Sequence, residues 1–224
     1  MKMKPLSHFL SITLFFLFHA VTAQQLYFNS GKNYTSYYYS KEVSNPSYLI
    51  TNSNLIADSG NSYELGILFN QGDTKVDYAL GITYNEFNTT YAIDQTAIKY
   101  SWQTKYIGIA PRLNFRLYQS SNKNWCDCNN GRLRVDAKLG VNTAAFVYGY
   151  ENASGINYTL TTHPDYKKII IQPFTGVDFS YPLSGMSSLH LGYAVSIAAI
   201  GRDQGNAFNF INHNFQLGFN LKLQ

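Results

Sequence analysis

A strict alternation of apolar and polar residues limits what this chain can fold into. In the clearest run, from Leu133 to Val147, one face is almost wholly apolar, and the other carries Arg134, Asp136 and Lys138. Successive side chains of a β-strand point to opposite faces, so a period of two indicates a strand. Globular strands have a typical length of about 5–6 residues. The run therefore predicts an unusually long strand.

The same pattern recurs along the chain. A weaker run lies within residues 25–39, where the parity is poor and Lys32 and Asn33 interrupt it. Charged residues make up only 13% and aromatic residues 16%, whereas soluble domains carry about 25% charged residues. Together these features predict an all-β protein. The further clear runs are residues 63–70, 76–85, 107–117, 169–181, 189–199 and 214–223.

The N-terminal segment has the pattern of a secretory signal. Lys2 and Lys4 precede an apolar run from Leu6 to Val21, and small residues follow up to Ala23. We expect a signal peptide over residues 1–23 and a mature domain over residues 24–224. A membrane anchor is the alternative, but the run is short and lacks a basic flank. Loss of the two lysines lowers the net charge from +4 to +2 (4 − 2), which gives no reason to expect nucleic acid as a partner.

The runs together predict a closed antiparallel up-and-down transmembrane β-barrel of about eight strands. Hydrocarbon offers no hydrogen-bond partner, so a spanning sheet must close on itself. A secreted soluble sandwich is the alternative fold. The connection at residues 119–131 is too long for a minimal periplasmic turn. Otherwise short connections, at 71–74 and 182–185, alternate with long polar ones at 40–60, 88–100, 151–167 and 201–208.

Aromatic residues cluster near the expected strand ends. Such rings suit the headgroup layer of a membrane, because one end is apolar and the other is wet. We therefore expect a girdle, with ordinary β-propensity of tyrosine as the alternative. The rings include Tyr37, Tyr84, Phe87, Tyr100, Trp102, Tyr148 and Tyr150.

These features resemble the small bacterial outer-membrane β-barrels, of the kind common among tyrosine- and asparagine-rich Bacteroidota proteins. The resemblance rests on the signal-like segment, the seven clear runs and the terminal strand from Phe215 to Gln224. It is architectural, since no family-specific motif is present. Many proteobacterial barrels end in Phe, whereas this chain ends in Gln224. The resemblance implies an integral outer-membrane protein in contact with outer-membrane lipid.

Charged residues on the inward face gather in the expected periplasmic half. An eight-stranded barrel is just wide enough for side chains to fill it. Because both signs are present, we expect an ion-pair network that closes this half, chiefly through Arg112, Arg134, Asp136 and Asp178; a conduction path is the alternative. The outer half has smaller inward residues, which predicts a shallow pocket open to the outside. The charged set is Asp77, Arg112, Arg116, Arg134, Asp136, Lys138, Asp178 and Lys222.

Little in the sequence points to catalysis. His190 and Ser196 share the inward face but lie six residues apart, about 20 Å along a strand and too far for a nucleophile and its base. Cys126 and Cys128 lie in the long turn, where a strained disulfide or a bond to a partner is expected, with two unpaired thiols as the alternative. Two cysteines alone do not make a zinc site. We expect no enzyme, no metal site and no cofactor.

These observations favour a non-enzymatic barrel. The first expectation is a scaffold or accessory subunit of a larger envelope complex, or a surface-binding protein. Its partners would be other outer-membrane or periplasmic proteins, since long loops on a rigid scaffold often carry binding. The alternative is a barrel that binds a small ligand or forms a narrow channel. A lipid-modifying outer-membrane enzyme is the least favoured.

Overall fold

The computed structural model describes residues 25–39, 55–70, 74–92, 99–120, 133–153, 155–160, 168–203 and 206–223. The expected signal peptide and the two cysteines, Cys126 and Cys128, lie outside these residues. Within them, no helix is long and apolar enough to cross a membrane.

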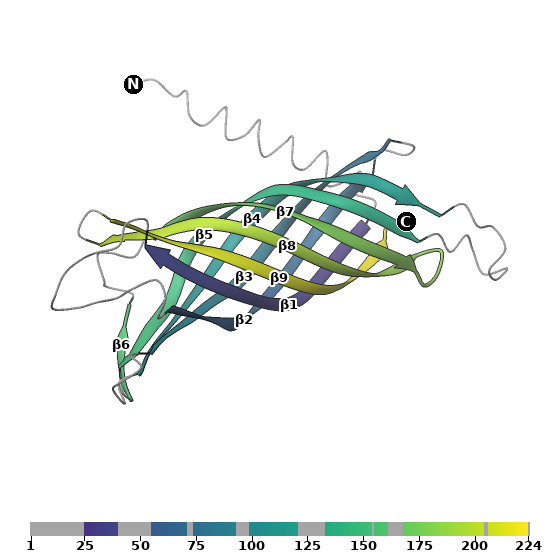
Figure 1. Ribbon diagram of the computed structural model, residues 1–224. Coiled ribbons are helices and arrows are strands. Elements are labelled where there is room, and N and C mark those ends of the chain that lie inside the picture. The colour runs from purple at the N-terminus through teal and green to yellow at the C-terminus, as the bar shows by residue number, and fades with distance from the viewer. Residues whose placement is uncertain are drawn as a thin grey trace, which may run out of the picture.

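The described residues form nine antiparallel strands (Figure 1). Eight of them close into a barrel, because β4 pairs with both β3 and β5 in the order β4-β3-β2-β1-β9-β8-β7-β5. The remaining strand, β6, pairs only with the end of β5, outside the ring. The strands are β1 (Gln25–Tyr39), β2 (Leu55–Asn70), β3 (Val76–Ala92), β4 (Lys99–Gln119), β5 (Arg134–Ala153), β6 (Ile156–Thr159), β7 (Ile169–Pro182), β8 (Ser187–Asp203) and β9 (Asn206–Lys222).

Closure makes the fold an eight-stranded, all-antiparallel barrel, as the alternation predicts. The weak first run corresponds to β1, which has 15 residues and pairs along its length with β9. Its parity is poor because its outward face carries Lys32, and its inward face carries Tyr27 and Tyr37. Every strand of the ring has a partner on both sides, so the ring leaves no open edge to the hydrocarbon.

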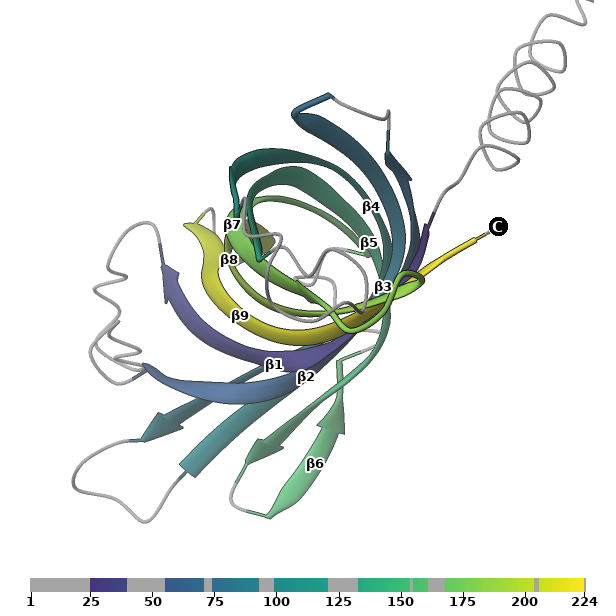
Figure 2. The ribbon, with the colours of Figure 1, turned by 90° about the vertical axis from the view of Figure 1, so that its right-hand side faces the viewer.

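The register around the ring is strongly staggered. Following paired residues from Gln25 through each strand in turn returns to β1 at Thr35, a stagger of ten residues (35 − 25). In a closed barrel such a stagger requires the strands to tilt against the axis, typically by about 35–45°. The tilt is visible in Figures 1 and 2.

The two ends of the barrel differ. Gln25 and Lys222 pair with each other at one end, which also holds the connection between Pro182 and Ser188. We call this the terminal end. The opposite end, which carries β6, is the loop end (Figure 1).

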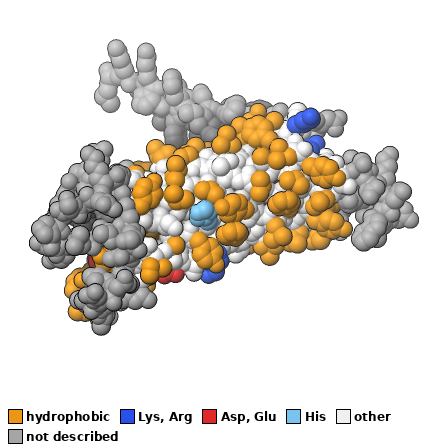
Figure 3. All heavy atoms as spheres, in the orientation of Figure 1, with side chains coloured by type: hydrophobic (Ala, Val, Ile, Leu, Met, Phe, Trp, Pro, Cys, Tyr) orange, Lys and Arg blue, Asp and Glu red, His pale blue; other side chains and the backbone are white. Residues whose placement is uncertain are grey.

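The outer surface of the ring is apolar. Leu139 and Leu217, on the apolar faces of their alternating runs, are 54% and 52% exposed. Leu191, Val141 and Phe219 are exposed on the same outer face. Figure 3 shows hydrophobic side chains over much of one side of the barrel. A soluble sandwich would bury these side chains, so the exposed band fits a barrel surrounded by hydrocarbon.

Candidate functional site

An aromatic cluster fills the bore towards the loop end. Tyr37, Phe87, Tyr106 and Phe210 are at most 5% exposed. The rings of Phe87 and Phe210, from strands three apart in the ring, lie 4.6 Å apart between centroids. Seven of the eight strands of the ring contribute a side chain to this plug, and β2 packs Leu55 against it. The plug consists of Tyr37, Phe87, Tyr106, Ala144, Ile170, Ala198 and Phe210, with Leu55 and Phe146 packed against it.

The plug corrects two expectations. The outer half does not hold a shallow pocket open to the outside, because large apolar side chains occupy the bore there. Tyr37 and Phe87 are also not girdle residues, since both lie buried inside the barrel. Tyr100 and Trp102 stack on each other, with ring centroids 6.2 Å apart. They share the inward face of buried Thr104, so they also differ from the expected girdle.

An amide-rich layer lies next to the plug on its terminal side. The Asn33 side chain accepts hydrogen bonds from Asn212 at 2.9 Å and from Asn214 at 2.6 Å. Gln172 donates to Ser196 at 2.6 Å. The cavity within this layer measures only about 60 Å³, which is room for a water or two. The bore is thus narrow here as well.

A layer of ion pairs follows. Arg112 pairs with Glu64, with side chains only 5% and 6% exposed. Arg134 pairs with both Asp77 and Asp136. These charges come from β2, β3, β4 and β5, so the pairs tie one side of the ring together. On the other side, Lys138 of β5 pairs with Asp178 of β7 at 2.8 Å.

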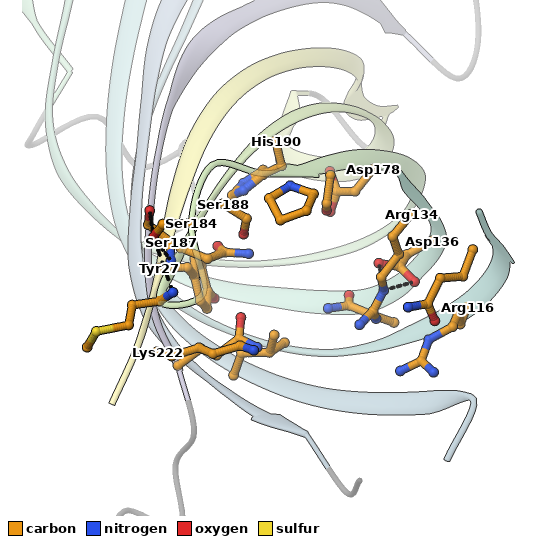
Figure 4. Close-up of a pocket in the computed structure, with 18 of the residues that line it drawn as sticks. Tyr27, Arg116, Arg134, Asp136, Asp178, Ser184, Ser187, Ser188, His190 and Lys222 are labelled. Carbon is orange, nitrogen blue, oxygen red and sulfur yellow. Dashed lines mark hydrogen bonds and ion pairs between the residues drawn. The ribbon is translucent and has the colours of Figure 1, made fainter. Parts of the chain in front are cut away.

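Beyond the ion pairs, the terminal end is hollow. A cavity of about 620 Å³ extends from the ion-pair layer to the rim, where Gln25 and Lys222 line it. We call this cavity the cup. Figure 4 shows its wall, with His190 and Asp178 on one side and Arg134 paired with Asp136 on another. The bore is therefore closed in its middle and outer parts and open at the terminal end.

The cup corrects a third expectation. Arg112, Arg134, Asp136 and Asp178 were expected to fill the periplasmic half, yet all four line the cavity. They stand on its walls, where short-range ion pairs hold three of them against the sheet. Arg134 pairs with Asp136 on the same strand, and Asp178 pairs with Lys138 of the neighbouring strand β5. Arg116 and Lys222 also line the cup. Among the described residues, neither lies within ion-pair distance of a carboxylate.

Two carboxylates in the structure were missing from the expected set. Glu64 lies inside the bore, where the alternation of residues 63–70 already placed it. Glu86 lies on the outer face of β3 and is only 6% exposed. It accepts a hydrogen bond from Asn61 at 2.9 Å and another from Gln103. Lys32 donates to Asn61 at 2.7 Å, so a polar row crosses the outer face of β1 to β4.

The remaining candidate groups, His190 and Ser196, have different hydrogen-bond partners. His190 Nε2 contacts the side-chain oxygen of Asn29, whereas Ser196 accepts from Gln172. The two groups proposed and rejected as a catalytic pair thus have different partners. Within the described residues, no group of three or more His, Cys, Asp or Glu side chains is placed to hold a metal ion.

Comparison with known proteins gives similarities only among solved structures. No protein-family model and no curated protein sequence matches this chain. The chain is similar to Neisserial surface protein A, with 14% identity, a TM-score of 0.45, and coverage of 88% of this chain and 97% of the other. It is also similar to Ail, the attachment invasion locus protein of Yersinia pestis, with 10% identity, a TM-score of 0.39, and coverage of 90% and 99%. These similarities concern the fold alone.

Proposed function

We propose that the protein is an integral outer-membrane barrel, non-enzymatic and closed to transport, that works through its ends as a scaffold or accessory subunit of a larger envelope assembly. The plug carries this proposal: a bore filled by Phe87, Phe210 and Tyr106 leaves the ends as the surfaces through which the protein meets other molecules. The terminal end faces the periplasm and the loop end faces outward, as in bacterial barrels with short periplasmic turns. A Bacteroidota source remains a prediction, based on the composition.

Photo-crosslinking in intact cells tests the assembly. A photoreactive residue placed at Lys75 samples the terminal rim, and one at Tyr158 samples the loop end; both side chains are exposed. We expect a discrete higher-mass adduct from at least one position. The matched control is Leu217, which faces lipid and should give no protein adduct. Monomer alone from both ends would overturn the scaffold role.

Conductance tests the closed bore independently. In planar bilayers the purified barrel should show no steady open current, because plug and ion-pair layers block the axis. A variant with Phe87→Ser, Tyr106→Ser and Phe210→Ser is the control for a widened bore. Steady nanosiemens current from the unmodified protein would contradict the proposal.

The second candidate is a small-ligand-binding barrel. One observation favours it: the cup of about 620 Å³ at the terminal end, a volume within the roughly 300–1,000 Å³ of ordinary ligand sites. This role is compatible with the first, since a scaffold can also hold a ligand on its periplasmic side.

A further inference from the structure

The cup contains two cations that the ion-pair network does not use. Arg112 and Arg134 each have a carboxylate partner. Lys138, which does not line the cavity, pairs with Asp178. Arg116 and Lys222 have none within the described part of the chain, although both line the cavity. The lining carries four cations and two carboxylates, Asp136 and Asp178, a balance of +2 (4 − 2). Both carboxylates are already paired.

The two unused cations stand across the cavity from each other. Arg116 lies on β4 and Lys222 on β9, and these strands are four apart in the eight-membered ring. They are therefore on opposite walls, as Figure 4 shows. Both are near the mouth of the cup, because each lies close to the end of its strand. A ligand entering from the terminal end would pass between them.

Deeper in the cup, buried polar atoms lack partners. Asn114 is only 5% exposed, and its Oδ1 has no hydrogen-bond partner among the described residues. The same holds for Nε of Arg112 and Nδ1 of His190, which are 7% and 5% exposed. Buried polar atoms are costly to leave unpaired, so such atoms favour a ligand that supplies the missing hydrogen bonds. Arg112, Asn114 and Arg116 alternate on one face of β4, so polar groups run from the floor to the mouth.

We propose that the cup binds the oxyanion group, phosphate or carboxylate, of a small solute, held between Arg116 and Lys222 with Asn114 beneath. This inference rests on the second proposed function, ligand binding at the terminal end. A guanidinium forks onto two oxygens of a phosphate or carboxylate, and an ammonium adds a point charge. The unpaired Oδ1 of Asn114 accepts a hydrogen bond from a hydroxyl of the bound solute, such as the protonated oxygen of a phosphate.

Titration of the purified full chain, refolded in a neutral detergent, tests the proposal. Inorganic phosphate and succinate are the probes for free solutes, and a short-chain phosphatidic acid is the probe for a lipid headgroup. Binding is followed by nuclear magnetic resonance shifts of backbone amides. We expect saturable binding of a free solute, with shifts confined to residues that line the cup. Saturation by the lipid alone would overturn the solute assignment.

Charge variants locate the site. Replacing Arg116→Gln and Lys222→Gln together should weaken binding at least tenfold, because both unused charges are lost. Lys75→Gln is the matched control, since Lys75 is exposed at the same end and does not line the cup. Arg116→Lys with Lys222→Arg should restore binding. No saturable binding, or equal loss in the control, would overturn the proposal, and the crosslinking result for the scaffold role would stand unaffected.

Discussion

Glu64 is the acceptor at the centre of the bore. Its carboxylate receives hydrogen bonds from Tyr27 at 2.7 Å and from Asn29 at 3.1 Å, and it pairs with Arg112. The Arg112 guanidinium also lies over the Tyr27 ring, 4.5 Å from its centroid. A buried charge is tolerated when its partner and its hydrogen bonds are all present. Glu64 and Arg112 therefore depend on each other.

Replacing Glu64→Ala should lower the free energy of unfolding by about 3–5 kcal/mol, because it leaves the Arg112 charge buried without its partner. Urea unfolding in phospholipid vesicles measures this. The control is Asp58→Ala, an exposed carboxylate on the same strand, which should change stability by no more than about 1 kcal/mol. Equal effects of the two variants would show that Arg112 finds other compensation.

The plug offers a second test at single residues. Phe210 is fully buried in it, whereas Phe215, on the same strand, is 52% exposed on the outer face. Phe210→Ala should cost about 3–5 kcal/mol, since it removes packed atoms and leaves a cavity. Phe215→Ala leaves no cavity and should cost clearly less. Equal losses, in the same unfolding measurement, would argue against a tightly packed plug.

The sequence predicts which face a residue lies on only where the two faces differ as expected. Glu86 and Phe87 show why the plug was missed. Towards the terminal end, apolar side chains point out and polar ones point in, but here polar Glu86 points out and Phe87 points in. Alternation still places Glu86 and Phe87 on opposite faces of the strand. The rule that the apolar face meets lipid, however, assigns Phe87 to the outside and Glu86 to the inside, which is the reverse of the structure. The ion pair of Glu64 was missed for another reason: pairing between strands depends on register, which the alternation leaves open.

At the scale of elements, β9 joins the last strand of the ring to the first, since it pairs with both β8 and β1. Its outward residues were placed from sequence alone, because one face is apolar over the whole terminal half. The irregular positions were not predictable. Gly60 lies where the pairing of β2 and β3 shifts, and a Cβ there would run into the backbone oxygen of Glu86. Nothing in the sequence distinguishes this glycine from one in a turn.

The register of β9 predicts the effect of a charge on the lipid face. Leu217→Arg should hinder assembly at a cost of about 2–4 kcal/mol, as for a cation near the bilayer midplane. Leu223→Arg is the matched control, because Leu223 is 47% exposed at the end of the strand and a cation near the interface costs only about 0–1 kcal/mol. Heat-modifiable migration on gels reports folding. Normal folding of the Leu217 variant would count against this register.

At the scale of the molecule, the sequence predicts the number of strands in the ring, its closure, and the start of the first strand and the end of the last at one rim. These follow from a count of long alternating runs and from the lengths of their connections. The placement of free space within the barrel does not follow, because it depends on which side chains meet across the bore. Phe87 and Phe210 meet there from distant strands. The sequence therefore predicted a pocket at the loop end, whereas the cavity lies at the terminal end.

The orientation of the whole barrel gives the last prediction. In a background with Cys126→Ser and Cys128→Ser, Tyr158→Cys should react with a membrane-impermeant thiol reagent in intact cells, because Tyr158 is 54% exposed at the loop end. Lys75→Cys, at the terminal end, should react only after the outer membrane is opened. The reverse pattern would invert the proposed topology.

The position of the plug also bears on how such a barrel enters a membrane. In the proposed topology the loop end crosses the hydrocarbon, and a sheet that has not yet closed can meet lipid on both faces. Near that end, the side chains destined for the bore include Phe87, Tyr106 and Phe210, whose transfer to lipid is favourable. The buried charges of Glu64 and Arg112 belong to the trailing half. Among the bore-facing side chains, the apolar ones thus lead into the membrane and the charged ones follow, so Glu64 and Arg112 can lose their water as they pair.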